Sequence, residues 1–283
     1  MRRHGRTSAF AIVSDERCGS AATPPGTLVW PVTTIDFSPI DHRLAWADAH
    51  AQRVKDLSVE WGATAMRTTT TTNTDRGIRE FRAEVVGEPP VTIALALGDV
   101  LHHARAALDN LMGVVRGGAT NKSGFRIDTD PATFDRDDAG KHAGVPDWAM
   151  AAIRQVQPFP DNPWRSVGEQ LLKLHSLAIL DRHRALLLSA AIIDLDKTHA
   201  ATSHPGDTQF GIREGGRVLT LEYPWDARVT PATGVQVIVP EELLRWPDRH
   251  WPAFPAAEDV ARSVLWAVRV TVEMTRQAAA SAP

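Results

Sequence analysis

The segment from Leu97 to Met112 constrains this chain most, because its pattern predicts a helix with a core face and a charged border. At ~100° per residue, the apolar side chains gather on one side of such a helix. They are Leu97, Leu101, Ala104, Leu108, Leu111 and Val115. His102, Arg105 and Asp109 flank this face within ~60° of one another. The pattern therefore predicts a buried helix over about 91–115 with polar groups at its rim.

A second segment, at about 163–184, is apolar in nearly every direction yet ends in charged residues. A helix of this kind is buried on most sides, and a buried charge without a partner is costly. We therefore expect the two helices to pair, with Arg105 bonded to Asp181 and Asp109 bonded to Arg184. The candidate functional residues are Arg105, Asp109, Asp181, His183, Arg184 and His102. They predict either a structural clasp or a small pocket, in which arginines hold phosphate and a histidine moves a proton.

The rest of the chain predicts an α+β fold, with a core of three or four helices and an antiparallel β-sheet on one side. Further helices are expected at about 38–61, 147–157 and 258–277. Strands are expected at about 78–86, 185–193, 209–212, 217–222 and 235–239. The sequence Arg213-Glu-Gly-Gly216 between two of these strands is a hairpin signal.

The first of these helices follows a segment without periodicity. Residues 1–37 are predicted to form a flexible tail, and residues 38–283 a single α+β domain. In the helix at 38–61, the apolar face is expected to hold Trp46, Val54, Leu57 and Trp61. His50 falls on the same face and is expected to be a core histidine bonded to a neighbour.

Charge and cysteine content narrow the class of protein. The formal net charge of −3 over 283 residues gives no global basic footprint for nonspecific nucleic-acid binding. The single cysteine, Cys18, excludes a disulfide within the chain and a cysteine-based metal site, and it fits a reducing compartment. No apolar run approaches the roughly 18 residues of a membrane span, and none near the N-terminus is long enough for a secretion signal. We therefore expect a cytoplasmic protein with no membrane contact.

Four segments carry a resemblance to a widespread family of uncharacterised bacterial proteins. Members read "GdiLhnlRsaLDhL", then "FPI", then "lqPy", then "L.eLd.iDKHRlLl". The counterparts here are 97–111, Phe125-Arg-Ile127, Val156-Gln-Pro-Phe159 and 174–187. The match covers most of residues 41–277 in order. The resemblance implies no particular activity, because the family has none assigned.

The "RsaLDH" element is also similar to the Arg-x4-6-His motif of HEPN-like helical domains. These domains resemble metal-independent ribonucleases, often in toxin or phage-defence systems. The resemblance implies that Arg105 would hold the scissile phosphate and that a histidine would take the ribose 2′-hydroxyl proton. Here Asn110 stands where the motif has its histidine, and an amide does not titrate near neutral pH. His102 or His183 would then have to supply the base.

Three functions follow from these patterns, and whether the protein is an enzyme stays open. The leading one is a binding or regulatory domain with a buried Arg/Asp/His clasp between two helices. The second is a HEPN-like ribonuclease or a catalytically degenerate relative that binds RNA. The third, a divalent-metal enzyme using His102, Asp109, His175 and Asp181, lacks any recognised metal-ligand spacing. We expect no cofactor and no metal, and the partners left open are RNA, a small anionic ligand and a second copy of the chain.

Overall fold

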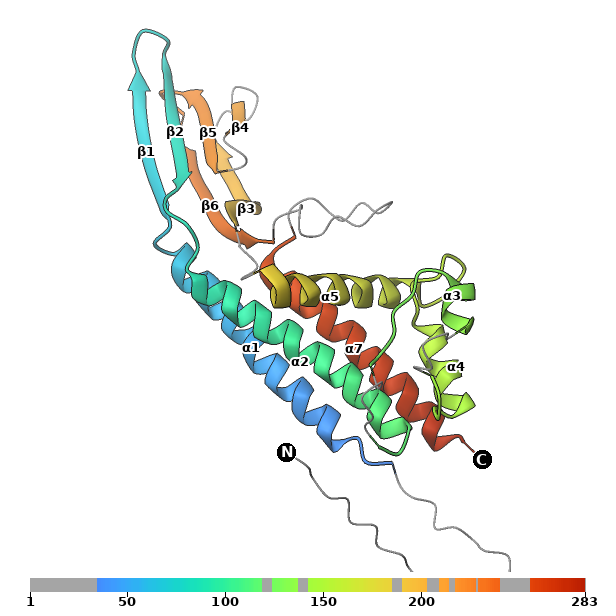
Figure 1. Cartoon of the computed structure of the whole chain (residues 1–283). Helices are drawn as coiled ribbons and strands as arrows, with labels where there is room; N and C mark the ends of the chain where they lie inside the picture. The colour runs from blue at the N-terminus through green and yellow to red at the C-terminus, as the bar shows by residue number, and fades with distance from the viewer. Residues whose placement is uncertain are drawn as a thin grey trace, which may run out of the picture. The chain divides into compact units, whose positions relative to one another are not determined.

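The computed structural model describes residues 35–118, 124–136, 142–184, 190–202, 209–213, 217–227, 229–239 and 255–282. Side chains are not described at 180–184, 190–202, 210, 213, 230–232 and 234. Residues 35–283 form one compact unit by their contacts. The predicted α+β class is confirmed, with a helical core and antiparallel strands on one side of it (Figure 1).

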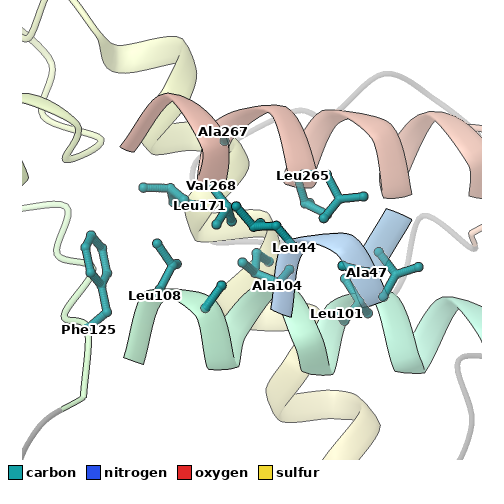
Figure 2. Packing of buried hydrophobic residues seen from close by; sticks show 14 of the residues in the cluster. Leu44, Ala47, Leu101, Ala104, Leu108, Phe125, Leu171, Leu265, Ala267 and Val268 are labelled. Carbon is teal, nitrogen blue, oxygen red and sulfur yellow. The ribbon is translucent and has the colours of Figure 1, made fainter. Parts of the chain in front are cut away.

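Four long helices build the core. They are α1 (Ser38–Gly62), α2 (Val91–Val115), α5 (Arg165–Arg184) and α7 (Ala257–Ala280). The helix α2 packs against the other three, and α7 also contacts α1, α5 and the short helix α4 (Asp147–Gln155). The six apolar positions expected on the inner face of α2 are all buried, as its period of 3.6 residues requires. Figure 2 shows Leu101, Ala104 and Leu108 of α2 facing Leu44 of α1 and Val268 of α7.

The strands form two antiparallel sheets. One has the order β1-β2-β5-β4 and the other pairs β3 with β6. Their bounds are β1 Met66–Asn73, β2 Ile78–Val85, β3 Ala190–Thr202, β4 Gln209–Arg213, β5 Val218–Pro224 and β6 Val229–Ile238. The inner face of the larger sheet has its own small core, which includes Phe81, Ala83, Leu219 and Leu221. The strand β4 pairs antiparallel with β5, as the predicted hairpin requires, and its turn at 214–216 lies outside the described residues.

Several elements differ from the sequence pattern. The threonine run at 68–72 belongs to a full strand, β1. Because this strand is polar and exposed, its sequence lacks the alternation of apolar and polar residues that predicts a strand. A short helix, α3 (Pro131–Arg136), lies outside all the helices expected from the sequence. Asp130 begins it, because its carboxylate accepts from Thr133 N–H at 2.9 Å. Of the predicted strand at 185–193, the first five positions fall outside the described residues.

Among the described residues, α2 is the one helix long and apolar enough to cross a membrane. Just over half of its most apolar window, 56%, is buried inside the protein. Burial of this kind is what a core helix of a globular domain shows, so the length and composition of α2 are weak evidence for a span.

Candidate functional site

Arg105 and Asp109 lie one turn apart on α2 and face the segment that follows this helix. Arg105 Nη2 lies 3.1 Å from Asp109 Oδ1, so the two side chains form an ion pair along the helix. The same guanidinium donates to Phe125 O at 2.5 Å, and Phe125 N–H donates to Asp109 Oδ1 at 2.9 Å. The pair therefore satisfies both main-chain groups of Phe125, as a neighbouring β-strand would.

The phenyl ring of Phe125 explains why these bonds matter for folding. Phe125 is 1% exposed and belongs to the main core, where Figure 2 shows it beside Leu108. A buried main-chain group without a partner costs about as much as a lost hydrogen bond. Arg105 and Asp109 let an irregular segment enter the core without that cost, and we call the three residues the Phe125 clamp.

A second polar contact lies next to the Phe125 clamp. Gln157 is fully buried, and its amide accepts from Asp128 N–H at 2.9 Å and donates to Arg126 O at 3.2 Å. The same amide nitrogen lies 3.2 Å from Ile153 O. The stretch 125–128 is thus held by α2 on one side and by the residues after α4 on the other. The segments 97–111, 125–127 and 156–159 thus meet here through structural contacts.

The main chain of Gln157 and Pro158 also packs closely against α5 at Gly168. A Cβ built on Gly168 would lie 2.3 Å from Pro158 N and 2.5 Å from Gln157 C. Only a glycine allows two backbones to approach this closely. The only trace of this contact in the sequence is a glycine inside a helical pattern, which usually has a packing reason.

The predicted partners of the clamp on α5 lie outside the described side chains. Asp181, His183 and Arg184 lie in the last turn of α5, but their side chains fall outside the described residues. The expected bonds from Arg105 to Asp181 and from Asp109 to Arg184 therefore stay predictions. Arg105 Nη1 is buried and has no hydrogen-bond partner among the described residues, so it is the atom that such a bond to Asp181 would use.

His102 lies apart from the clamp, in a group of rings on the surface formed by α1 and α2. Its imidazole meets that of His103 edge to face, with centroids 5.5 Å apart. The ring of His103 in turn stacks on His50, at 5.5 Å, and on Trp46, at 6.2 Å. Arg43 Nη1 lies 3.4 Å from His103 Nδ1. We call Arg43, Trp46, His50, His102 and His103 the ring surface.

Electrostatics on the ring surface favour the neutral form of the His103 imidazole. Burial lowers the pKa of His103 below its usual 6.5, and the charges of His102, Arg43 and His50 lower it further. Asp99 opposes this trend and lies 3.4 Å from His50 Nδ1. The surface thus combines flat aromatic rings with the guanidinium of Arg43.

The expectation that Trp46 faces the core is wrong, because its side chain is 60% exposed. The buried positions of α1 are Ile40, Leu44, Ala47 and Val54, which recur at helical spacing. Trp46 precedes Ala47 by one residue and is therefore turned by ~100° from that row. His50 is half-buried beside it and bonded to Asp99, so it borders the core without entering it. Because alanine is small and only weakly apolar, Ala47 did not mark the buried face of α1 in the sequence.

No group of three or more His, Cys, Asp or Glu side chains that could hold a metal ion occurs among the described residues. His102 and Asp109 belong to the ring surface and to the Phe125 clamp respectively. Of the other two residues considered as metal ligands, His175 is half-buried on α5, and the side chain of Asp181 is not described.

Comparisons with protein-family models, with curated proteins and with solved structures found no match for this chain. The geometry of the clamp and of the ring surface therefore carries the functional argument.

Proposed function

We propose that this protein is a binding or regulatory domain in which the Arg105–Asp109 pair is structural. The observation that carries the proposal is that both side chains bond to the main chain of Phe125. The Arg105 side chain is only 13% exposed and already binds a carbonyl and a carboxylate. A catalytic arginine must instead be free to meet a phosphate. Asn110, in place of the motif histidine, supports the same conclusion.

The ring surface is where we place the ligand, and we propose single-stranded RNA. Bases stack on exposed aromatic side chains, and Trp46 offers such a platform at 60% exposure. Arg43 supplies a cation for the phosphate next to a stacked base. The net charge of −3 means that this attraction has to be local, and it should be strongly sensitive to salt.

Fluorescence anisotropy with a labelled 12-nucleotide RNA tests this. Trp46→Ala should weaken binding by about five- to a hundredfold, the range of one base–aromatic stack. Trp225→Ala is the matched control, because Trp225 is 58% exposed and follows β5, away from the helices. Equal affinity of both variants and the wild type would refute the assignment. Full competition by inorganic phosphate would point to a small anionic ligand.

The second candidate is a HEPN-like ribonuclease, and one observation favours it. Arg105 Nη1 has no hydrogen-bond partner among the described residues, so one nitrogen of the guanidinium is unused. Because this atom is buried, the ribonuclease hypothesis requires the surrounding chain to open before a phosphate oxygen reaches it. A metal-independent ribonuclease would cleave RNA in the presence of EDTA, and Arg105→Ala would abolish cleavage while leaving the fold intact. If the arginine is structural, no cleavage occurs and Arg105→Ala lowers the free energy of unfolding by about 2–3 kcal/mol.

We further propose that the protein works in the cytoplasm. The burial of α2 within the helical core supports this, since its apolar surface is already covered by protein. Cell fractionation of the full chain tests it, and recovery in the membrane pellet after a high-salt wash would argue against it.

A further inference from the structure

The strand β1 is an uncovered edge. It is the outer strand of the larger sheet, and among the described residues it pairs with β2 alone (Figure 1). Seven of its eight residues are exposed, and five of them are the consecutive threonines 68–72. Natural edge strands are usually shielded by a proline, a bulge or several charges. The strand β1 has only Arg67 for this purpose, so it is open to pairing.

The register with β2 fixes which main-chain groups reach the free edge. Val86 N–H donates to Ala65 O at 2.7 Å, and this pair continues the register of Met66 opposite Val85. Antiparallel partners alternate between hydrogen-bonded and non-hydrogen-bonded pairs. The odd-numbered residues from 65 onward therefore bond to β2. The N–H and C=O groups of the even-numbered residues 66–72 point away from the sheet.

Two opposite charges mark the ends of this edge. Arg67 lies near the start of β1, and Asp75 lies in the turn that follows the strand. Neither has an ion-pair partner within the part of the chain that the structure describes. If two β1 strands pair antiparallel about a twofold axis at Thr71, Arg67 of one copy faces Asp75 of the other. In this register Thr70 of one copy opposes Thr72 of the other, so their outward main-chain groups also meet, and Thr68 faces Thr74 in the turn.

We propose that the protein forms a homodimer through antiparallel pairing of β1 with β1 of a second copy. Cross-strand threonine pairs are favourable, and a run of identical residues is complementary to itself. The twofold axis makes each charged pair occur twice. The two four-stranded sheets become one continuous sheet, and the open β1 edge of each copy is covered. This interface is independent of the proposed RNA site on α1 and α2.

The oligomeric state of the full chain tests the proposal. Light scattering after size exclusion should give twice the mass of one 30.9 kDa chain as the concentration rises. Thr70→Pro removes one outward N–H and no bond to β2, a place where an edge strand tolerates proline. This variant should be monomeric with an unchanged circular dichroism spectrum. A wild type that is monomeric at every concentration, or a dimer unaffected by Thr70→Pro, overturns the proposal.

A charge swap tests the register. Arg67→Asp and Asp75→Arg should each weaken the dimer about tenfold, because each places like charges opposite one another twice. The double variant restores opposite charges and should recover nearly the wild-type dissociation constant. Arg53→Asp, the same change on an exposed position of α1, should have no effect. A double variant no tighter than the single ones overturns the proposed pairing.

Discussion

Replacing Gly168 with alanine tests how closely α5 approaches the segment after α4. The new Cβ would lie 2.3 Å from Pro158 N, 2.5 Å from Gln157 C and 2.6 Å from Pro158 Cα, all of them main-chain atoms. Non-bonded heavy atoms prefer separations of about 3.5 Å, so one backbone must move by ~1 Å. No side chain can rotate away to absorb this movement.

Two effects of the substitution oppose each other. Alanine favours the helix by about 1 kcal/mol over glycine. Overpacking of a core costs about 1–3 kcal/mol, and a shift at Gln157 would also strain its bonds to Asp128 N and Arg126 O, each worth about 1 kcal/mol. The steric cost prevails, and we expect a net loss of about 2–3 kcal/mol.

Urea unfolding followed by circular dichroism measures this loss, provided that the dependence on urea concentration stays parallel to that of the wild type. Gly62→Ala in α1 is the matched control, because its Cβ would meet nothing closer than Val235 O at 3.7 Å. We expect the control to unfold within about 1 kcal/mol of the wild type. A Gly168→Ala protein as stable as this control would refute the close approach of α5.

Three further predictions concern single side chains. Gln157→Leu should lower the free energy of unfolding by about 2–4 kcal/mol, because buried main-chain groups of Asp128 and Arg126 lose their partner; chemical denaturation measures this. Arg154→Ala should change it by less than about 1 kcal/mol, since the ion pair with Asp135 is half exposed, and a larger loss would contradict this. The pKa of His103 is lowered in the folded state, so the unfolded chain binds more protons below pH 6.5. Stability should therefore fall as the pH drops through 6.5, and His103→Gln should reduce this fall in melting temperature.

The helices were predictable from the sequence because their apolar side chains repeat every 3.6 residues over long segments. The pattern located α2 at its observed bounds. In α7, Val260, Val264, Ala267 and Thr271 recur at helical spacing and are buried. The strand β1 was not predictable in the same way, because its threonines are exposed on both faces and do not alternate.

In the candidate site, too, the local features were predictable from the sequence and the long-range contacts were not. The sequence placed Arg105 and Asp109 on one edge of a core helix, since their spacing of four residues is local. It did not show that their partner is the main chain of Phe125, sixteen residues beyond Asp109. Main-chain N–H and C=O groups are the same in nearly every residue, so the sequence does not show which side chain will bond to them. Only the tertiary structure shows this.

Local periodicity thus determined which segments are helical and which faces of them are buried. The tertiary structure decided what the polar residues at those faces contact. It turned Trp46 outward, brought His50 and His103 together from two helices, and pressed Gly168 onto Pro158. The physical reason is the sequence separation over which each effect acts. Helical periodicity relates residues only a few positions apart. A buried polar group, in contrast, bonds to whichever group the folded chain brings near it, at any separation in the sequence.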